Sequence, residues 1–259
     1  MKITILADNK VIETGVNLKA EWGFSALVEF DEPILFDTGK EVAFENLKTL
    51  KKDLPKKIIL SHGHYDHTTG IVQFLDNSEV YAHPDVFLPR FLKGRYIGIP
   101  YLKSLVESRA KIFENTEPQK ISKNIWLSGE IPRIFGDSTL KEAIIVREGK
   151  KEFDQILDDQ AIFVKSSRGI LVLVGCCHAG LLNTLKWAEE VLGDEVKAIV
   201  GGMHLVNKKD DEVREIVKKI DYLELIAPCH CTGLKAEMII ADFFKERYKA
   251  VGSGSVLGF

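Results

Sequence analysis

Three histidines and one aspartate lie within seven consecutive residues, in the run Ser61-His62-Gly63-His64-Tyr65-Asp66-His67. Folding alone does not require this density, whereas metal ions bind imidazole nitrogens and carboxylate oxygens. Alternate side chains of an extended segment point to the same side, so His62 and His64 can bind one ion. Asp66 and His67 follow after a turn and can face a second ion. The run therefore predicts a site for two metal ions.

The segments around this run indicate where the ligands lie in the fold. An apolar, strand-like stretch from Lys57 to Leu60 comes before it, and Thr68-Thr69-Gly70 with the apolar Ile71 and Phe74 reads as the start of a helix behind it. A ligand string between a strand and a helix is the context that supports a metal motif. We therefore expect the ligands at the end of a strand.

The string H-x-H-x-D-H resembles the hallmark of the metallo-β-lactamase superfamily. A second resemblance lies in Pro33-Ile34-Leu35-Phe36-Asp37-Thr38-Gly39, where that superfamily has a strand ending in Asp-Thr-Gly. The resemblance implies that Asp37 supports the metal ligands from behind. It also implies an α/β fold, a four-layer αββα sandwich of two mixed β-sheets with helices on the outer faces. We expect one domain over residues 1–259, with an irregular, lid-like insertion at about 84–153.

Further segments resemble one subgroup of the superfamily. They are Glu21-Trp22-Gly23-Phe24-Ser25, Gly129-Glu130-Ile131-Pro132-Arg133, Asp158-Asp159-Gln160-Ala161, Gly175-Cys176-Cys177-His178-Ala179-Gly180, Gly201-Gly202-Met203-His204-Leu205 and His230-Cys231-Thr232-Gly233. The subgroup includes the archaeal 7,8-dihydropterin-6-methyl-4-(β-D-ribofuranosyl)aminobenzene 5'-phosphate synthase. The resemblance implies either hydrolysis of a small phosphoester or ester, or condensation of a pterin with ribofuranosylaminobenzene phosphate.

Hydrophobic periodicity predicts strands and helices that place more histidines at strand ends. Strands are expected at 2–7, 23–30, 33–36, 79–82, 161–165, 170–174, 196–200 and 223–227, and helices at 41–52, 181–192 and 212–220. The last three strands are followed by His178, His204 and His230, and strand ends are where α/β folds gather their sites. We predict that His178 and His230 are the remaining ligands. His204 is predicted to donate a proton to a leaving group beside the catalytic Asp66, and the alternative is that His204 is itself a ligand.

The resemblance also bears on which metal is bound. It assigns His230 to the ion held by Asp66 and His67, and it implies zinc as the first choice. Superfamily members usually carry a bridging carboxylate where this chain has Cys176-Cys177-His178. Asp158 or Asp159 falls where many relatives have a histidine, and an oxygen ligand there would favour Fe²⁺ or Mn²⁺.

All four cysteines flank a predicted ligand, at positions 176, 177, 229 and 231. In a cytoplasmic protein, this grouping favours thiols near a metal over disulfides. The spacing is not the C-x-x-C of a closed structural zinc site, so an open catalytic site is expected. Small packing residues beside the ligands are the alternative interpretation.

Residues 84–153 contain arginines and aromatic residues that suit a substrate with a phosphate and a flat ring. Candidate substrate contacts are Arg90, Arg95, Tyr96 and Arg133. Guanidinium groups bind phosphate through paired hydrogen bonds and stack on rings. A surface insertion whose aromatic residues pack on one another is the competing interpretation.

Composition limits the remaining possibilities. The 259 residues are 45% hydrophobic and 28% charged, with a net charge of −3. This balance gives no general attraction for nucleic acid, and neither a signal peptide nor a membrane span is evident. We expect a cytoplasmic enzyme with a phosphate-bearing substrate, from a heat-adapted source because Lys and Glu are many and Gln few. An RNA-processing nuclease of the same fold and a non-catalytic metal-binding or small-molecule-binding regulator are the alternatives, and the oligomeric state is left open.

Overall fold

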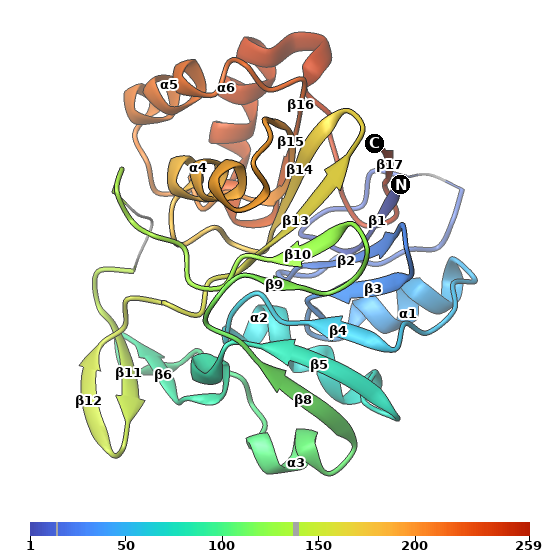
Figure 1. The fold of residues 1–259 in the computed structure, drawn as a ribbon, viewed down its shortest axis with the longest axis vertical. Helices are drawn as coiled ribbons and strands as arrows, with labels where there is room; N and C mark the ends of the chain where they lie inside the picture. Colours follow the sequence, from blue (N-terminus) through green and yellow to red (C-terminus); the bar gives the residue numbers. More distant parts are fainter. Residues whose placement is uncertain (14, 137–139) are drawn as a thin grey trace. The chain divides into compact units, whose positions relative to one another are not determined.

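The computed structural model describes residues 1–13, 15–136 and 140–259 (Figure 1). Within this part, the chain forms two compact units. The first unit comprises residues 1–116, 140–158 and 252–259, and the second comprises residues 117–136 and 159–251. The single domain expected from the sequence remains a prediction.

A seven-stranded mixed sheet forms the centre of the first unit, in the order β17-β1-β2-β3-β4-β5-β8. Antiparallel pairs join β17, β1, β2 and β3, and parallel pairs join β3, β4, β5 and β8. The strands are β1 (Lys2–Ala7), β2 (Ser25–Glu29), β3 (Pro33–Phe36), β4 (Lys57–Ile59), β5 (Ser78–Ala82), β8 (Ala110–Glu114) and β17 (Val256–Gly258). The parallel pairs place the ends of β3 and β4 at one edge, where the motif residues follow them.

Helices of the first unit pack against apolar strand residues of this sheet. They are α1 (Val42–Thr49), α2 (Tyr65–Thr68), η1 (Thr69–Gln73), η2 (Pro84–Phe87) and α3 (Lys103–Glu107). Buried Leu47 of α1 belongs to one cluster with Leu6 and Leu35 of the strands. The Glu21 carboxylate accepts hydrogen bonds from the backbone N–H groups of residues 40–42. It thereby caps α1, whose first amides have no partner within the helix.

The segment expected to form an irregular insertion contains regular strands. A four-stranded sheet in the first unit has the order β12-β11-β6-β7. Its strands are β6 (Arg90–Leu92), β7 (Arg95–Tyr96), β11 (Ala143–Arg147) and β12 (Lys150–Phe153). Three other strands lie in the same segment: β8 extends the main sheet of the first unit, while β9 and β10 belong to the second unit. A lid function for this segment remains a prediction.

The second unit is built on a six-stranded mixed sheet in the order β16-β15-β14-β13-β10-β9. The strands are β9 (Gln119–Lys120), β10 (Ile125–Leu127), β13 (Ala161–Ser166), β14 (Gly169–Val174), β15 (Val196–Gly202) and β16 (Leu225–Cys229). β13 and β14 form an antiparallel hairpin, and β14, β15 and β16 run parallel. The three strands that the sequence predicts to deliver histidines therefore end at one edge of this sheet.

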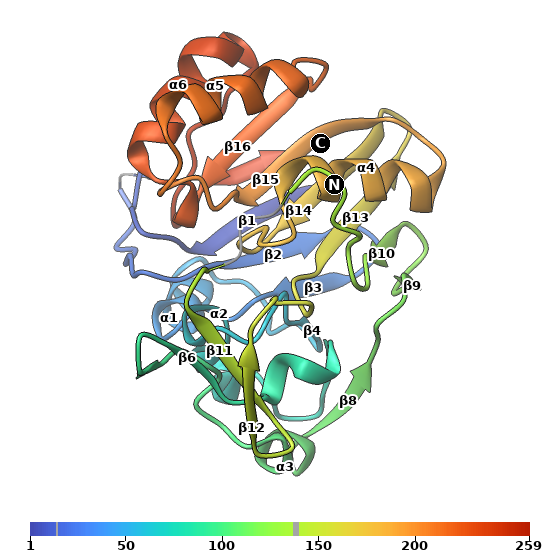
Figure 2. The same ribbon diagram turned by 90° about the vertical axis from the view of Figure 1, so that its left-hand side faces the viewer.

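Helices α4 (Leu181–Leu192), α5 (Asp210–Lys219) and α6 (Leu234–Phe244) pack on the sheet of the second unit. Figure 2 shows α4 beside β14, and α5 beside α6. Alternate strand residues, among them Phe163, Val172 and Ile199, share one buried cluster with the apolar faces of the helices. Each unit is thus an α/β assembly with a mixed sheet, as predicted. In the described part of the chain, no helix combines the length and apolar character needed to cross a membrane.

Candidate metal centre

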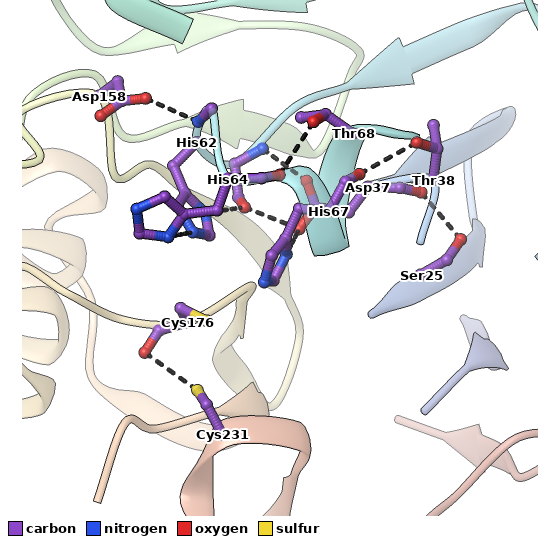
Figure 3. Close-up of polar contacts among 12 residues, drawn as sticks. Ser25, Asp37, Thr38, His62, His64, His67, Thr68, Asp158, Cys176 and Cys231 are labelled. Atoms are coloured by element: carbon purple, nitrogen blue, oxygen red, sulfur yellow. Dashed lines mark hydrogen bonds and ion pairs between the residues drawn. The ribbon is translucent and has the colours of Figure 1, made fainter. Parts of the chain in front are cut away.

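Asp37 is the centre of a buried hydrogen-bond network at the ends of β3 and β4. Its Oδ2 atom lies 2.6 Å from Nδ1 of His67 and accepts a 2.7 Å hydrogen bond from Oγ of Ser61. Its Oδ1 atom accepts the Ser61 backbone N–H at 2.7 Å. Ser25 donates to the Asp37 carbonyl at 2.8 Å (Figure 3). These four contacts fix Asp37 in place, and its support of metal ligands remains a prediction.

This network also sets which nitrogen of each ring faces outward. The Asp37 carboxylate can only accept, so Nδ1 of His67 carries the proton and Nε2 keeps its lone pair. The Ser61 hydroxyl, having donated to Asp37, accepts from Nδ1 of His62 at 2.8 Å. Nε2 of His62 is therefore also the basic nitrogen. Fixing a histidine through its second nitrogen is the usual arrangement behind a metal ligand.

The rings of His62, His64 and His67 lie close together in the first unit. Nε2 of His62 lies 2.9 Å from Nδ1 of His64, and the rings of His62 and His67 are 4.3 Å apart. Two nitrogens bound to one tetrahedral Zn²⁺ at 2.0–2.1 Å would be about 3.3 Å apart. A small widening of the observed pair would thus admit an ion. The histidine set of the first unit fits a divalent metal.

The helix behind the ligands begins earlier than predicted. α2 starts at Tyr65, so Asp66 and His67 lie within its single turn rather than before it. Thr68 donates to the His64 carbonyl at 2.9 Å, and Thr38 donates to the His67 carbonyl through both its amide and its hydroxyl. These bonds tie the turn to the end of β3, so both Asp66 and His67 are held on a rigid backbone.

Asp158 supports the loop that carries His62 and His64 from a distant part of the sequence. Its Oδ2 atom accepts the backbone N–H of Gly63, between the two histidines, at 2.8 Å. Its Oδ1 atom lies 2.8 Å from the Arg90 guanidinium, which also lies 3.4 Å from Asp154. Arg90 is fully buried. The pairing gives Arg90 a structural role, and its predicted contact with substrate remains a prediction.

The other candidate substrate residues are distributed over both units. Arg95 and Tyr96 are exposed on β7, where the Tyr96 hydroxyl donates to the Ile99 carbonyl at 2.7 Å. Arg133 is half-buried in the second unit. Their contacts with a substrate remain predictions.

Strained backbone marks the strand ends of the second unit. Cys177, His204 and His230 follow β14, β15 and β16, and all three have left-handed φ angles of 59°, 44° and 50°. In the first unit, Asp37 has the same conformation with φ of 56°. Such φ values are uncommon outside glycine and collect at functional sites. The strain therefore coincides with residues that the sequence singled out for chemistry.

Two predicted residues of the second unit are brought together by the fold. The rings of His178 and His204 lie 4.4 Å apart. The loop carrying His178 is held by Asp159, whose carboxylate accepts the Ala179 N–H at 2.8 Å. The joining of these residues and His230 with the first-unit histidines in a single site remains a prediction.

The four cysteines are all free thiols but differ in their surroundings. Cys177 packs in the apolar cluster of the second unit beside Thr184, and burial raises the pKa of its thiol. Burial also opposes ionisation of Cys231, but hydrogen bonds with Cys176 and His204 outweigh it and hold the pKa of Cys231 well below its ordinary value. Cys177 thus fits the interpretation as a packing residue, and the presence of thiols near a metal remains a prediction.

Sequence reasoning missed Ser61 and Glu21 as supporting residues. Ser61 links Asp37 to His62, and its only signal is its position immediately before the histidine string. Glu21 lies in a segment noted for its resemblance, yet its capping of α1 depends on contacts about twenty residues away. Neither role follows from residue type alone.

Comparison with known proteins identifies the family. Residues 24–144 match the metallo-beta-lactamase superfamily. The crystal structure of Tm1679, described as a metal-dependent hydrolase of the beta-lactamase superfamily, superposes with a TM-score of 0.91 at 32% identity, over 100% of this chain and 99% of that chain. The chain therefore belongs to the metallo-β-lactamase superfamily, and the predicted fold class is confirmed.

Two relatives come from Methanocaldococcus jannaschii. An uncharacterised protein is 36% identical over 96% of this chain and 98% of its own length. A second, named 7,8-dihydropterin-6-methyl-4-(beta-D-ribofuranosyl)-aminobenzene-5'-phosphate synthase, is 27% identical over 93% of this chain and 90% of its own length. The subgroup resemblance noted in the sequence is thus matched by a relative along nearly the whole chain.

Proposed function

We propose that this protein is a metal-dependent hydrolase that cleaves a small phosphoester or ester. One observation carries the proposal: the buried Asp37 carboxylate fixes His67 directly and His62 through Ser61, leaving Nε2 of both rings basic. A protein gains little stability by burying three histidines in this arrangement, but it gains a ligand set for a divalent cation. Membership of the superfamily and the likeness to Tm1679 support the same conclusion.

The ligand set proposed for two ions combines residues of the string with histidines at later strand ends. It consists of His62, His64, Asp66, His67, His178 and His230. Zn²⁺ is the proposed metal because imidazoles dominate the set, and Fe²⁺ or Mn²⁺ is the alternative if further oxygen ligands join. Bound divalent ions supply a lowered pKa for water and stabilisation of negative charge on the reacting group.

Other roles in the proposed reaction fall to individual side chains of the protein. The Asp66 carboxylate orients the attacking water and accepts its hydrogen bond. The His204 imidazole supplies a proton to the leaving oxygen, because a weakly basic leaving group departs more readily. Arg95, Tyr96 and Arg133 are proposed to contact a phosphate-bearing substrate. These roles are consistent with a soluble small-molecule substrate and with action in the cytoplasm.

Condensation of a pterin with ribofuranosylaminobenzene phosphate is a second candidate function. The relative named for that synthase supports it, since it matches 93% of this chain at 27% identity. Ions held by the same residues would then bind the substrate phosphate instead of a water. Product analysis by mass spectrometry with both pterin and phosphate substrates would separate condensation from simple hydrolysis.

The nuclease and regulator alternatives have less support. A net charge of −3 gives no general attraction for RNA, so binding of single-stranded RNA below micromolar concentrations would favour the nuclease. A regulator would bind metal without turnover. Metal-dependent cleavage of any substrate at a catalytic rate would exclude that role.

Turnover of bis(p-nitrophenyl) phosphate and of p-nitrophenyl acetate tests the hydrolase. Metal-free protein should be inactive and should regain activity with Zn²⁺ or Mn²⁺. Asp66→Ala should reduce turnover at least a hundredfold with an unchanged circular dichroism spectrum. The matched control is Asp76→Ala, which removes an exposed carboxylate of the same unit that pairs with Arg109. Equal activity of metal-free and metal-loaded protein would overturn the proposal.

A further inference from the structure

Three potential metal ligands meet within the second unit alone. The thiols of Cys176 and Cys231 and a ring nitrogen of His204 all lie within 4.8 Å of one another. They follow the parallel strands β14, β15 and β16, whose ends share one edge of the sheet. None of them belongs to the histidine string, so this group can be assessed apart from it.

The surroundings of Cys231 favour a sulfur that carries negative charge. The His204 backbone N–H donates to Sγ of Cys231 at 3.3 Å. Hydrogen bonds from backbone amides to sulfur are a recurring feature of metal-bound thiolates, whose charge and potential they adjust. The thiol itself lies 3.6 Å from the Cys176 carbonyl (Figure 3). The backbone thus fixes the position of the sulfur before any ligand arrives.

Gly202 at the end of β15 leaves the space that this sulfur occupies. A Cβ atom at position 202 would lie 2.8 Å from Sγ of Cys231, 3.3 Å from Cδ2 of His230 and 2.3 Å from the Gly175 carbonyl oxygen. Only glycine allows the strand end and the sulfur to approach so closely. The close approach brings the sulfur within reach of the His204 ring.

Burial and accessibility also suit a cation. Cys176 is 4% exposed and Cys231 is 2% exposed, so both sulfurs are shielded from oxidants and from bulk water. His204 is only half-buried, so part of its surface is accessible to solvent. Two sulfurs and one nitrogen leave the fourth position of a tetrahedral ion open.

We propose that Cys176, His204 and Cys231 form a second type of cation site, one that takes a thiophilic divalent ion such as Zn²⁺. Both sulfurs bind as thiolates, so any proton that a thiol still carries passes to solvent as two metal–sulfur bonds and one metal–nitrogen bond form. The site goes beyond the proposed hydrolase, since it uses neither Asp66 nor the histidines of the first unit. An ion there engages the ring proposed as the proton donor, so excess thiophilic metal should inhibit hydrolysis.

Cadmium titration of the reduced, metal-free, full-length protein tests the site, because cadmium–thiolate bonds give a charge-transfer band in the ultraviolet. The wild type should show the band. Cys231→Ser and Cys176→Ser should each lose at least half of its intensity, and His204→Ala should weaken cadmium binding at least tenfold. Cys177→Ser is the matched control, because Cys177 packs in the apolar cluster, and it should keep the full band.

His67→Ala separates this site from the proposed hydrolase. It removes a first-unit ligand and should abolish hydrolysis while the band persists. Loss of the band in His67→Ala, or full retention in Cys231→Ser, would overturn the inference. X-ray absorption of cadmium-loaded wild type provides a readout that needs no variant: two sulfur ligands support the site, and a shell of nitrogen and oxygen alone contradicts it. Failure of hydrolysis with the band intact would count against the proposed function only.

Discussion

The Asp37 carboxylate lies 2.6 Å from Nδ1 of His67, and neither side chain has any exposed surface. The pair joins the end of β3 to the turn of α2, and Ser61 extends it to His62. A buried carboxylate in this position does more than fill space, because it selects the tautomer of the ring and raises its basicity. Its removal should therefore affect metal binding more than folding.

Asp37→Ala should weaken metal binding by about 10–100-fold, the range found for residues that support metal-bound histidines. Competition with a chromophoric chelator measures the dissociation constant. Asp76→Ala, at an exposed carboxylate, serves as the control and should leave it unchanged. A folded Asp37→Ala protein with wild-type affinity would show that the carboxylate does not support the ligands.

Arg90→Met should destabilise the protein by about 3–5 kcal/mol, since it leaves buried carboxylates without a positive partner. Urea denaturation of wild type and variant measures the free energy of unfolding. Adding Asp158→Asn to Arg90→Met should restore part of the loss, because the two side chains are coupled across 2.8 Å. Arg109→Met, which breaks an exposed ion pair, should cost less than about 1 kcal/mol. Strict additivity of the two buried changes would contradict the coupling.

The Asp85–Arg147 pair should make stability depend on pH in the acid range. Burial opposes ionisation of Asp85, but hydrogen bonds from Arg147 at 2.5 and 2.7 Å outweigh it and lower the pKa of the carboxyl. A lowered folded-state pKa adds stability above the unfolded pKa of about 3.9, and this stability is lost as the pH falls through the folded value. The stability difference between wild type and Arg147→Met should thus be full at pH 7 and should shrink below about pH 4. Thermal unfolding across pH 3–7 measures it, and a difference that grows toward acid would be the wrong sign.

Gly63→Ala should disturb the metal-binding loop. A Cβ atom there would lie 2.3 Å from the Val86 carbonyl oxygen and 3.0 Å from its carbon, both backbone atoms that cannot rotate away. The loop must shift, and the Gly63 hydrogen bond to Asp158 must lengthen. We expect a lower melting temperature together with weaker metal binding. Gly258→Ala, where an added Cβ meets nothing within 4 Å, should leave both unchanged.

Local patterns predicted many of the regular elements. The spacing of apolar residues and the following Gly193 placed a helix at 181–192, and α4 spans Leu181–Leu192 with Gly193 in a left-handed conformation. The strand predicted at 2–7 is β1. Amphipathic spacing and a glycine that ends a helix are properties of short segments. They can therefore be recognised without knowledge of the fold.

Features that depend on distant contacts could not be predicted. The bond from Gly63 to Asp158 joins residues 95 positions apart, and Arg90 became structural only because the fold buries it. The segment 84–153 was expected to be irregular because its strands are two to five residues long, which is too short for a clear alternation. The histidine string was recognisable because its predicted ligands are close in sequence. The hydrogen bonds between Ser61 and Asp37, by contrast, depend on the parallel pairing of β3 with β4.

The left-handed conformation of Asp37, His204 and His230 restricts which amino acids evolution or a designer can place there. Apart from glycine, the residues that tolerate this conformation best are Asn, Asp and His. Two of these three are common metal ligands, and the third offers an amide oxygen. Drift at positions 204 and 230 would therefore tend to exchange one donor atom for another, so that metal preference could change in single steps while the main chain stays as it is.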